Sequence, residues 1–194
     1  MHERRFAASQ AHRLDDPQRQ AWLPPAEVLN ALARRSGETV ADVGAGTGYF
    51  TLPLARAVGP DGKVYAVDAQ TEMLTWLKSK LDREGLANVE LVHAEADQTG
   101  LPEASCNLYF LANVWHELED CGAVAREARR VLKAGGRIAI LDWRPDVNPE
   151  NGPPLAHRLD PSHAANHLHA AGFELAVTVT IGRYSWLVQA KARP

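Results

Sequence analysis

A glycine-rich turn beside a carboxylate is the first place where this sequence suggests ligand chemistry. Its residues are Asp42, Gly44, Ala45, Gly46 and Gly48. Glycine lets a ligand approach the backbone closely, and Val40 and Val43 before the turn suit a buried strand. Apolar residues at helical spacing resume at Phe50. The turn therefore joins the carboxyl end of a strand to the amino terminus of a helix, where open α/β sheets bind ligands.

The spacing of these glycines and the nearby acid argue against a dinucleotide. A pyrophosphate-binding fingerprint that starts at Gly44 requires its third glycine at position 49, where the sequence has Tyr49. The carboxylate of Asp42 would repel a pyrophosphate, whereas it could receive an ammonium group. The turn therefore favours a cationic ligand, and a nicotinamide-dependent dehydrogenase is the weaker alternative.

A second acid, Asp68, ends the short alternating stretch 63–68, which is predicted to be the next strand. A carboxylate at a strand end can accept two hydrogen bonds from a ribose diol. The alternative is a helix cap, because residues 69–84 carry apolar residues on one helical face. The position at the tip of the strand favours the ribose interpretation.

The run at residues 40–48, Val-Ala-Asp-Val-Gly-Ala-Gly-Thr-Gly, resembles motif I of the class I S-adenosylmethionine-dependent methyltransferases. Further features similar to this family follow in order: the strand that ends at Asp68, an acidic turn before Leu101 and Pro102, and the passage Arg-Val-Leu-Lys-Ala-Gly-Gly-Arg at 130–137. Over residues 25–190 the sequence is most similar to the subgroup that includes the ubiquinone and menaquinone biosynthesis methyltransferases.

The resemblance implies S-adenosyl-L-methionine as the cofactor and a place for each of its parts. Asp42 with the turn 44–48 would hold the methionine moiety, and Asp68 the ribose. Asp97 would accept a hydrogen bond from the adenine amine, and the backbone near Gln98 would complete the adenine contact. Glu95 competes for that role, and the alternative for both acids is a solvated loop.

The predicted fourth strand, residues 107–112, leads to Asn113 and His116, which by the same resemblance line the pocket beside the sulfonium. Imidazole titrates near neutral pH and could deprotonate an acceptor. His116 and Asp142, which ends the stretch 137–142, are the candidate catalytic residues. A dedicated base is optional, since placement alone accelerates such displacements, and His116 could instead be a packed residue bonded to backbone.

The predicted fold is α/β: a Rossmann-like, seven-stranded, mostly parallel sheet flanked by helices. Helices are expected at 25–35, 69–84, 123–132 and 161–171, with Lys133, Gly135 and Gly136 ending the third of these. The stretches 175–181 and 184–190, joined by two residues, predict a C-terminal antiparallel hairpin. Asn107 stands where the family often has an acid, and we interpret that position as structural.

Two segments outside the regular elements could border the pocket. Residues 1–24 are an N-terminal leader that could act as a lid and bring Trp22 near the ligand, or could be disordered. By the resemblance, residues 25–194 are expected to form the methyltransferase domain. The proline-rich loop 143–154 could wall the acceptor site, with Trp143 as a stacking surface and Arg144 as a partner for an acidic substrate, or could be an ordinary exposed loop.

Composition narrows the class of protein. The 194 residues fit one domain, and Cys106 and Cys121 form no metal-binding pattern, which suits a reducing cytosol. We expect a cytoplasmic protein, because the sequence has neither a signal peptide nor a membrane-spanning run. With a net charge of −3 and no basic stripe, nucleic acid is a poor partner. His163 and His167 lack the third ligand of a metal site, so no metal is expected.

The predicted function is S-adenosylmethionine-dependent methyl transfer to a small-molecule acceptor. One alternative is a module that binds the cofactor without transferring its methyl group. Arsenic methylation is disfavoured, because two cysteines are too few to bind a soft metalloid. No motif specifies the acceptor or the oligomeric state.

Overall fold

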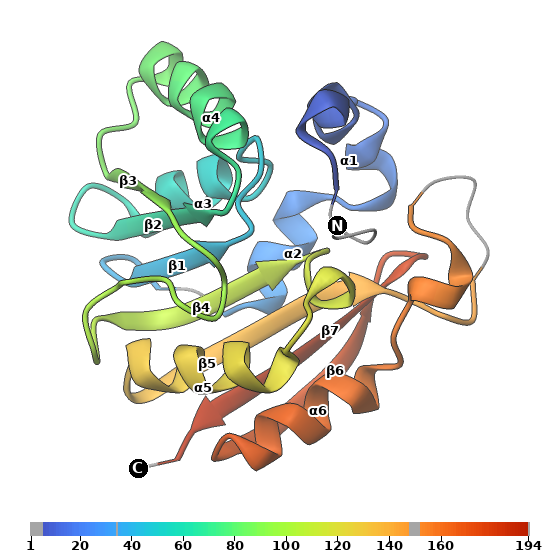
Figure 1. Cartoon of the computed structure of the whole chain (residues 1–194). Helices are drawn as coiled ribbons and strands as arrows, with labels where there is room; N and C mark the ends of the chain where they lie inside the picture. Colours follow the sequence, from blue (N-terminus) through green and yellow to red (C-terminus); the bar gives the residue numbers. More distant parts are fainter. Residues whose placement is uncertain (1–5, 34, 148–151, 194) are drawn as a thin grey trace.

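The computed structural model describes residues 6–33, 35–147 and 152–193, which build a single sheet flanked by helices (Figure 1). The seven strands lie in the order β3-β2-β1-β4-β5-β7-β6. They are β1 (Thr39–Val43), β2 (Lys63–Asp68), β3 (Val89–His93), β4 (Cys106–Ala112), β5 (Leu132–Trp143), β6 (Phe173–Ile181) and β7 (Ser185–Ala192). β1 to β5 pair in parallel, whereas β7 is antiparallel to β5 and β6. The predicted fold class is confirmed.

Helices cover both faces of this sheet. The α-helices are α1 (Arg19–Trp22), α2 (Pro25–Ala31), α3 (Thr51–Val58), α4 (Thr71–Glu84), α5 (Cys121–Val131) and α6 (Pro161–Ala170), and the 3-10 helices are η1 (Ala8–Asp15), η2 (Trp115–Glu117) and η3 (Leu155–His157). The helices α5 and α6 share one buried apolar cluster with the sheet, and α2 and α3 share another (Figure 1). α4 packs over β2, where Leu77 and Leu81 meet Ala66.

The central strand β4 shows why both faces need helices. Successive side chains of a strand point to opposite faces, so Tyr109 and Leu111 join the cluster of α5 and α6, whereas Leu108 and Phe110 join that of α2 and α3. All four are fully buried. A strand buried on both sides is expected to be an uninterrupted apolar run, which is what the sequence has here.

Several predicted element ends are wrong, among them that of the helix expected at 25–35, which ends at Ala31. Lys133, Gly135 and Gly136 lie in β5 and do not end the third predicted helix, because that helix stops at Val131 and Leu132 already pairs with Cys106 of β4. The hairpin between β6 and β7 has three connecting residues, 182–184, and Ile181 pairs with Ser185. The glycines mark an irregularity in the pairing of β5 with β4 and the turn between β6 and β7, but glycine alone does not give the register.

None of the helices in the described part of the chain is both long and apolar enough to cross a lipid bilayer.

Candidate functional site

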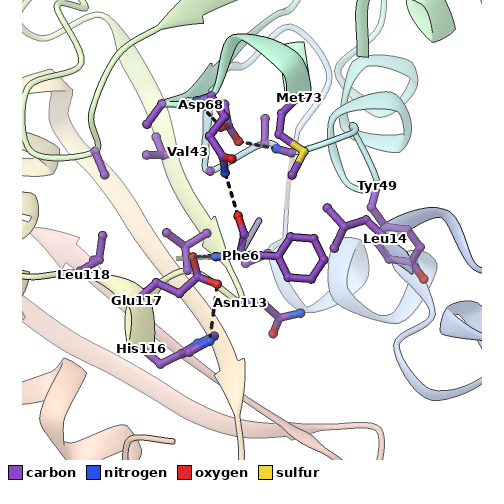
Figure 2. Close-up of a pocket in the computed structure, with 18 of the residues that line it drawn as sticks. Phe6, Leu14, Val43, Tyr49, Asp68, Met73, Asn113, His116, Glu117 and Leu118 are labelled. Carbon is purple, nitrogen blue, oxygen red and sulfur yellow. Dashed lines mark hydrogen bonds and ion pairs between the residues drawn. The ribbon is translucent and has the colours of Figure 1, made fainter. Parts of the chain in front are cut away.

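A cavity of about 840 Å³ lies at the carboxyl ends of β1, β2 and β4. This volume lies within the range of about 300–1,000 Å³ that is usual for small-molecule sites. It is lined by the loops after these three strands, by residues of the N-terminal segment such as Phe6 and Leu14 (Figure 2), and by residues 152–154 and 157.

The glycine-rich turn is shaped by packing as much as by ligand access. The amides of Gly44 and Ala45 donate to the Val67 carbonyl over 2.8 and 3.0 Å, which holds the turn against β2. A Cβ atom at Gly44 would lie 2.3 Å from Val114 Cγ2, and one at Gly48 would lie 2.4 Å from Leu77 Cδ1. Both glycines also have positive φ, so any other residue there would be strained.

Asp68 ties this turn to the end of β2. Its Oδ2 accepts from the Gly46 amide at 2.8 Å and its Oδ1 accepts from the Gln70 amide at 2.9 Å (Figure 2). The cap residue of α4 is Gln70, so Asp68 does not occupy the cap position that was the alternative for it. Its carboxylate lines the cavity between the turn and α4.

Asp42 lines the same cavity from β1 and is 2% exposed. Its Oδ2 accepts from the Thr51 hydroxyl at 2.6 Å. Burial raises the pKa of Asp42 to about 7, with the Thr51 hydrogen bond opposing and the nearby charge of Asp68 adding to the shift. A cationic ligand group beside Asp42 would favour its charged form.

Only some of the residues predicted to contact adenine line the cavity. Asp97 and Glu95 are exposed and line the cavity. Gln98 and Gly48 are not among the described lining residues. The Gln98 amide donates to the Glu95 carbonyl at 3.2 Å, which closes the acidic turn on itself.

Asn113 supplies an unsatisfied polar atom to the cavity. It has φ +59°, unusual for a residue with a side chain, and its amide donates to the Leu141 carbonyl at 2.8 Å. Its side chain points into the cavity (Figure 2), and its Oδ1 is buried without a hydrogen-bond partner in the described structure. A buried acceptor left unpaired is costly, so this atom fits a hydrogen-bond donor carried by a ligand.

The two candidate catalytic residues form a pair. His116 lines the cavity and is 5% exposed, and its Nδ1 lies 2.8 Å from Asp142 Oδ1. Asp142, 1% exposed, lies behind it and also accepts from the backbone amides of His116 and Trp143. Burial opposes a charge on His116, but Asp142 outweighs it, with Glu117 adding to the effect, so the pKa of His116 is raised. The carboxylate also fixes which ring nitrogen faces the cavity.

The N-terminal segment is folded over the cavity. The Gln70 side chain binds it twice, donating to the Phe6 carbonyl at 2.9 Å and accepting from the Ala8 amide at 3.2 Å. The Phe6 amide donates to Glu117 Oε2 at 3.0 Å, and Trp22 also lines the cavity. No motif singled out Phe6, Gln70 or Glu117; the nearest signals were the positions of Gln70 two residues after Asp68 and of Glu117 next to His116.

Trp143 also lines the cavity, and it packs against Trp22 with ring centroids 5.1 Å apart. Arg144, predicted as a partner for an acidic substrate, instead pairs with Asp146 at 2.6 Å and is not among the described lining residues. Residues 148–151 of the predicted acceptor loop lie outside the described residues.

His163 and His167 lie away from the cavity, where Trp115 Nε1 donates to His163 Nδ1 at 3.2 Å. Within the described ranges, no cluster of three or more His, Cys, Asp or Glu side chains could hold a metal ion.

Comparison with known proteins gives concordant matches. A family model described as a methyltransferase domain matches residues 41–140. The chain is 34% identical over 116 residues to a demethylmenaquinone methyltransferase of Geobacillus stearothermophilus, which covers 60% of this chain and 50% of that protein. A ubiquinone/menaquinone biosynthesis C-methyltransferase of Hahella chejuensis is also 34% identical over 116 residues, covering 59% and 47%. The chain spans about half the length of these curated relatives.

Solved structures extend the similarity to nearly the whole chain. A SAM dependent methyltransferase from Aquifex aeolicus has a TM-score of 0.91 and 34% identity, and the match covers 96% of this chain and 99% of that one. The [4+2]-cyclase SpnF has a TM-score of 0.73 with 16% identity over 87% of this chain and 81% of its own, so it shares the fold alone. One fold thus carries different chemistries, and the side chains of the cavity must decide the reaction.

Proposed function

This chain belongs to the methyltransferase domain family, and from that premise we propose that it transfers the methyl group of S-adenosylmethionine to a small-molecule acceptor. The observation that carries the proposal is one cavity lined both by the residues suited to the cofactor and by a histidine paired with a buried aspartate. The unpaired Asn113 Oδ1 in that cavity supports a ligand that brings hydrogen-bond donors.

The proposed cofactor contacts follow from the chemistry of each side chain. Asp42 and the turn 44–48 hold the amino acid end, with Asp42 and Asn113 as acceptors for its ammonium group. Asp68, already fixed by the Gly46 amide, accepts from the ribose hydroxyls, and Asp97 accepts from the adenine amine. Gln98 keeps only a backbone role in this arrangement, at the edge of the adenine turn. The cofactor would supply an electrophilic methyl group on a sulfonium.

His116 and Asp142 act on the acceptor. The Nδ1 atom of His116 is held by Asp142, so Nε2 is the atom available to accept a proton from an acceptor O–H, N–H or activated C–H group. Asp142 stabilises the imidazolium that forms and keeps the ring oriented. The cavity walls, including Trp143 and Trp22, position the acceptor against the methyl group and exclude water.

The proposal extends to the acceptor and to the cellular location of the protein. The quinone precursors named for the curated relatives are the first acceptors to test. A cytoplasmic location is supported by two free, buried thiols, Cys106 and Cys121. Nucleic acid is not proposed as a partner.

The experiment that tests the proposal is calorimetry with S-adenosylmethionine and with NAD, followed by mass spectrometry of reactions containing methyl-labelled donor and demethylated quinols. We expect micromolar binding of S-adenosylmethionine alone and a labelled product. Binding without product from any acceptor pool would favour the non-catalytic module, and binding of NAD instead would favour the dehydrogenase.

A further inference from the structure

Arg19 is a buried guanidinium in the wall of the cavity with fewer partners than donors. It is 7% exposed and lines the cavity from α1. Its Nη1 donates to the Leu14 carbonyl at 3.1 Å, and its Cζ lies 4.0 Å from the centre of the Tyr49 ring. Its Nε is buried and has no hydrogen-bond partner within the described ranges. A guanidinium carries five N–H donors, so this one is poorly satisfied.

Among the described residues, the charge of Arg19 is not balanced by an ion pair. Burial lowers the pKa of Arg19 to about 10, while Tyr49 and Asp15 favour its charge, so it is a cation at neutral pH. Asp15 is the nearby acid, but its Oδ1 already accepts from the Thr47 hydroxyl at 2.7 Å and from Lys80 Nζ at 2.5 Å. No ion pair joins Arg19 to an acid in the described part of the chain. Buried charges in proteins are normally paired, so an anionic ligand group in the cavity would balance the charge of Arg19.

The position of Arg19 connects it to the glycine-rich turn. Tyr49, on which the guanidinium lies, directly follows Gly48. Leu14, whose carbonyl accepts from Arg19, has its Cδ1 3.3 Å from where a Cβ atom at Gly46 would be. Asp42 lines the same cavity with the opposite charge. The cationic side chain of Arg19 and the acidic side chain of Asp42 near one turn suit a zwitterionic ligand, which carries both a carboxylate and an ammonium group.

We propose that Arg19 is an anion-binding residue of this cavity and that its ligand is a carboxylate. The carboxylate comes from one of two sources, the amino acid end of the methyl donor or an acidic acceptor molecule. The inference deepens the proposed function and rests on it for the identity of the donor. Guanidinium suits this task, because its fork of donors matches the two oxygens of a carboxylate.

The donor source is tested by calorimetry with S-adenosylhomocysteine and with its decarboxylated counterpart. If Arg19 binds the donor carboxylate, Arg19→Gln weakens S-adenosylhomocysteine binding about 10- to 100-fold. The decarboxylated compound then binds the variant as it binds the unaltered protein. Arg56→Gln is the matched control, because Arg56 is exposed on α3, pairs with Glu84 and is not among the described lining residues of this cavity. Thermal unfolding of both variants checks that they fold.

The acceptor source is tested on protein saturated with S-adenosylhomocysteine, using 4-hydroxybenzoate and its uncharged amide. If Arg19 binds an acidic acceptor, Arg19→Gln weakens 4-hydroxybenzoate binding at least tenfold and leaves the amide and S-adenosylhomocysteine unaffected. Arg19→Lys, which keeps the charge but not the fork, should fall between.

The proposal is overturned if Arg19→Gln leaves both charged compounds within twofold of their original affinities, or weakens charged and uncharged partners equally. A protein that does not bind S-adenosylhomocysteine refutes the proposed function separately. In that case the anion site is tested by adding sulfate and measuring the unfolding temperature. A rise that occurs in the unaltered protein and is lost in Arg19→Gln supports the anion site, and an equal rise in both proteins overturns it.

Discussion

Two buried aspartates that line the cavity, Asp42 and Asp68, and one that lies behind His116, Asp142, differ in how their charge is compensated. Asp68 accepts from two backbone amides, and Asp142 accepts from His116 and two backbone amides. Asp42 accepts from the Thr51 hydroxyl, and burial raises its pKa to about 7. Asp68 and Asp142 are therefore fixed in advance, whereas Asp42 changes protonation when a cation binds beside it.

Asp68→Ala should weaken S-adenosylhomocysteine binding by about 1.5–3 kcal/mol, or roughly 10- to 100-fold, because it removes charge-assisted hydrogen bonds to a diol and releases the Gly46 amide. Calorimetry measures the loss. Asp82→Ala is the control, since Asp82 is exposed on α4 and binds Lys78. An affinity unchanged by Asp68→Ala would refute the ribose assignment.

Asp142→Asn should lower the pKa of His116. Burial acts to lower it, and the charge of Asp142 is the largest influence that raises it, so removal of that charge leaves burial dominant. NMR titration of the imidazole measures the change. Glu117→Gln should lower the pKa less, because Glu117 Oε1 lies 3.8 Å from His116 Nε2.

The pH dependence of the activity should shift in the same direction as the pKa of His116. A base must be neutral, so the rise with pH of kcat/KM, which reports the free protein, has its midpoint above the ordinary value of about 6.5 in the unaltered protein and at a lower pH in Asp142→Asn. Equal midpoints in the two proteins would count against His116 as the base.

At the scale of elements, η1 and α4 are joined over the glycine-rich turn. Lys80 of α4 lies 2.5 Å from Asp15 at the end of η1 and also donates to the Thr47 carbonyl at 2.8 Å. Thr47 in turn donates to Asp15. This three-residue contact fixes the N-terminal segment above the proposed cofactor site, as a lid requires.

Lys80→Met should loosen that segment and speed the release of S-adenosylhomocysteine. The pair is partly exposed, so about 0.2–1 kcal/mol is at stake, which corresponds to a rate up to about fivefold higher. Stopped-flow tryptophan fluorescence measures the rate, because Trp22 and Trp143 line the cavity. Lys78→Met breaks an exposed pair on the same helix and should leave the rate unchanged. Equal rates in all three proteins would exclude a role for the contact.

The elements themselves were largely predictable, because periodicity and turn residues are local signals. The apolar run of β4 and the end of β2 at Asp68 lie where the sequence indicates them, whereas β5 starts five residues earlier than predicted and ends one residue after Asp142. The pairing of His116 with Asp142 could have been inferred, since His116 follows β4, Asp142 lies near the end of the neighbouring parallel strand β5, and Ala112 pairs with Leu141.

The contributions of the N-terminal segment were not predictable in the same way. The bond between Gln70 and Phe6 joins residues 64 positions apart, and Arg19 reaches the cavity only because α1 folds back over Tyr49. No periodic pattern encodes such a contact, which depends on the packing of the finished fold. The register of the hairpin between β6 and β7 was predicted wrongly for a related reason. Glycine permits a turn at several positions, and pairing with the partner strand selects one of them.

At the scale of the molecule, the position of the cavity follows from topology. Chain order reverses at β1, with β2 paired to one side of it and β4 to the other, so the loops after these strands diverge and leave a crevice. Asp42 lies at this point on a strand buried on both faces, which is why its carboxylate is so strongly desolvated. The site and the stability of the whole fold are therefore linked through one residue.

This link predicts how the free energy of unfolding changes with pH. The pKa of Asp42 is about 7 when folded against about 3.8 when unfolded, so the folded state holds its proton more tightly and loses stability as pH rises between these values. The loss at full ionisation is at most about 4 kcal/mol. His116, whose pKa is also raised, acts in the same direction: its contribution is complete below about 6.5 and is lost as pH rises through the folded pKa.

Asp42→Asn should therefore be more stable than the unaltered protein at pH 8, and the gain should be much smaller at pH 5. Urea unfolding measures both differences, and His116→Gln separates the contribution of His116. A difference between the Asn variant and the original protein that stays constant from pH 5 to 8 would mean that Asp42 is already ionised in the folded protein at pH 5.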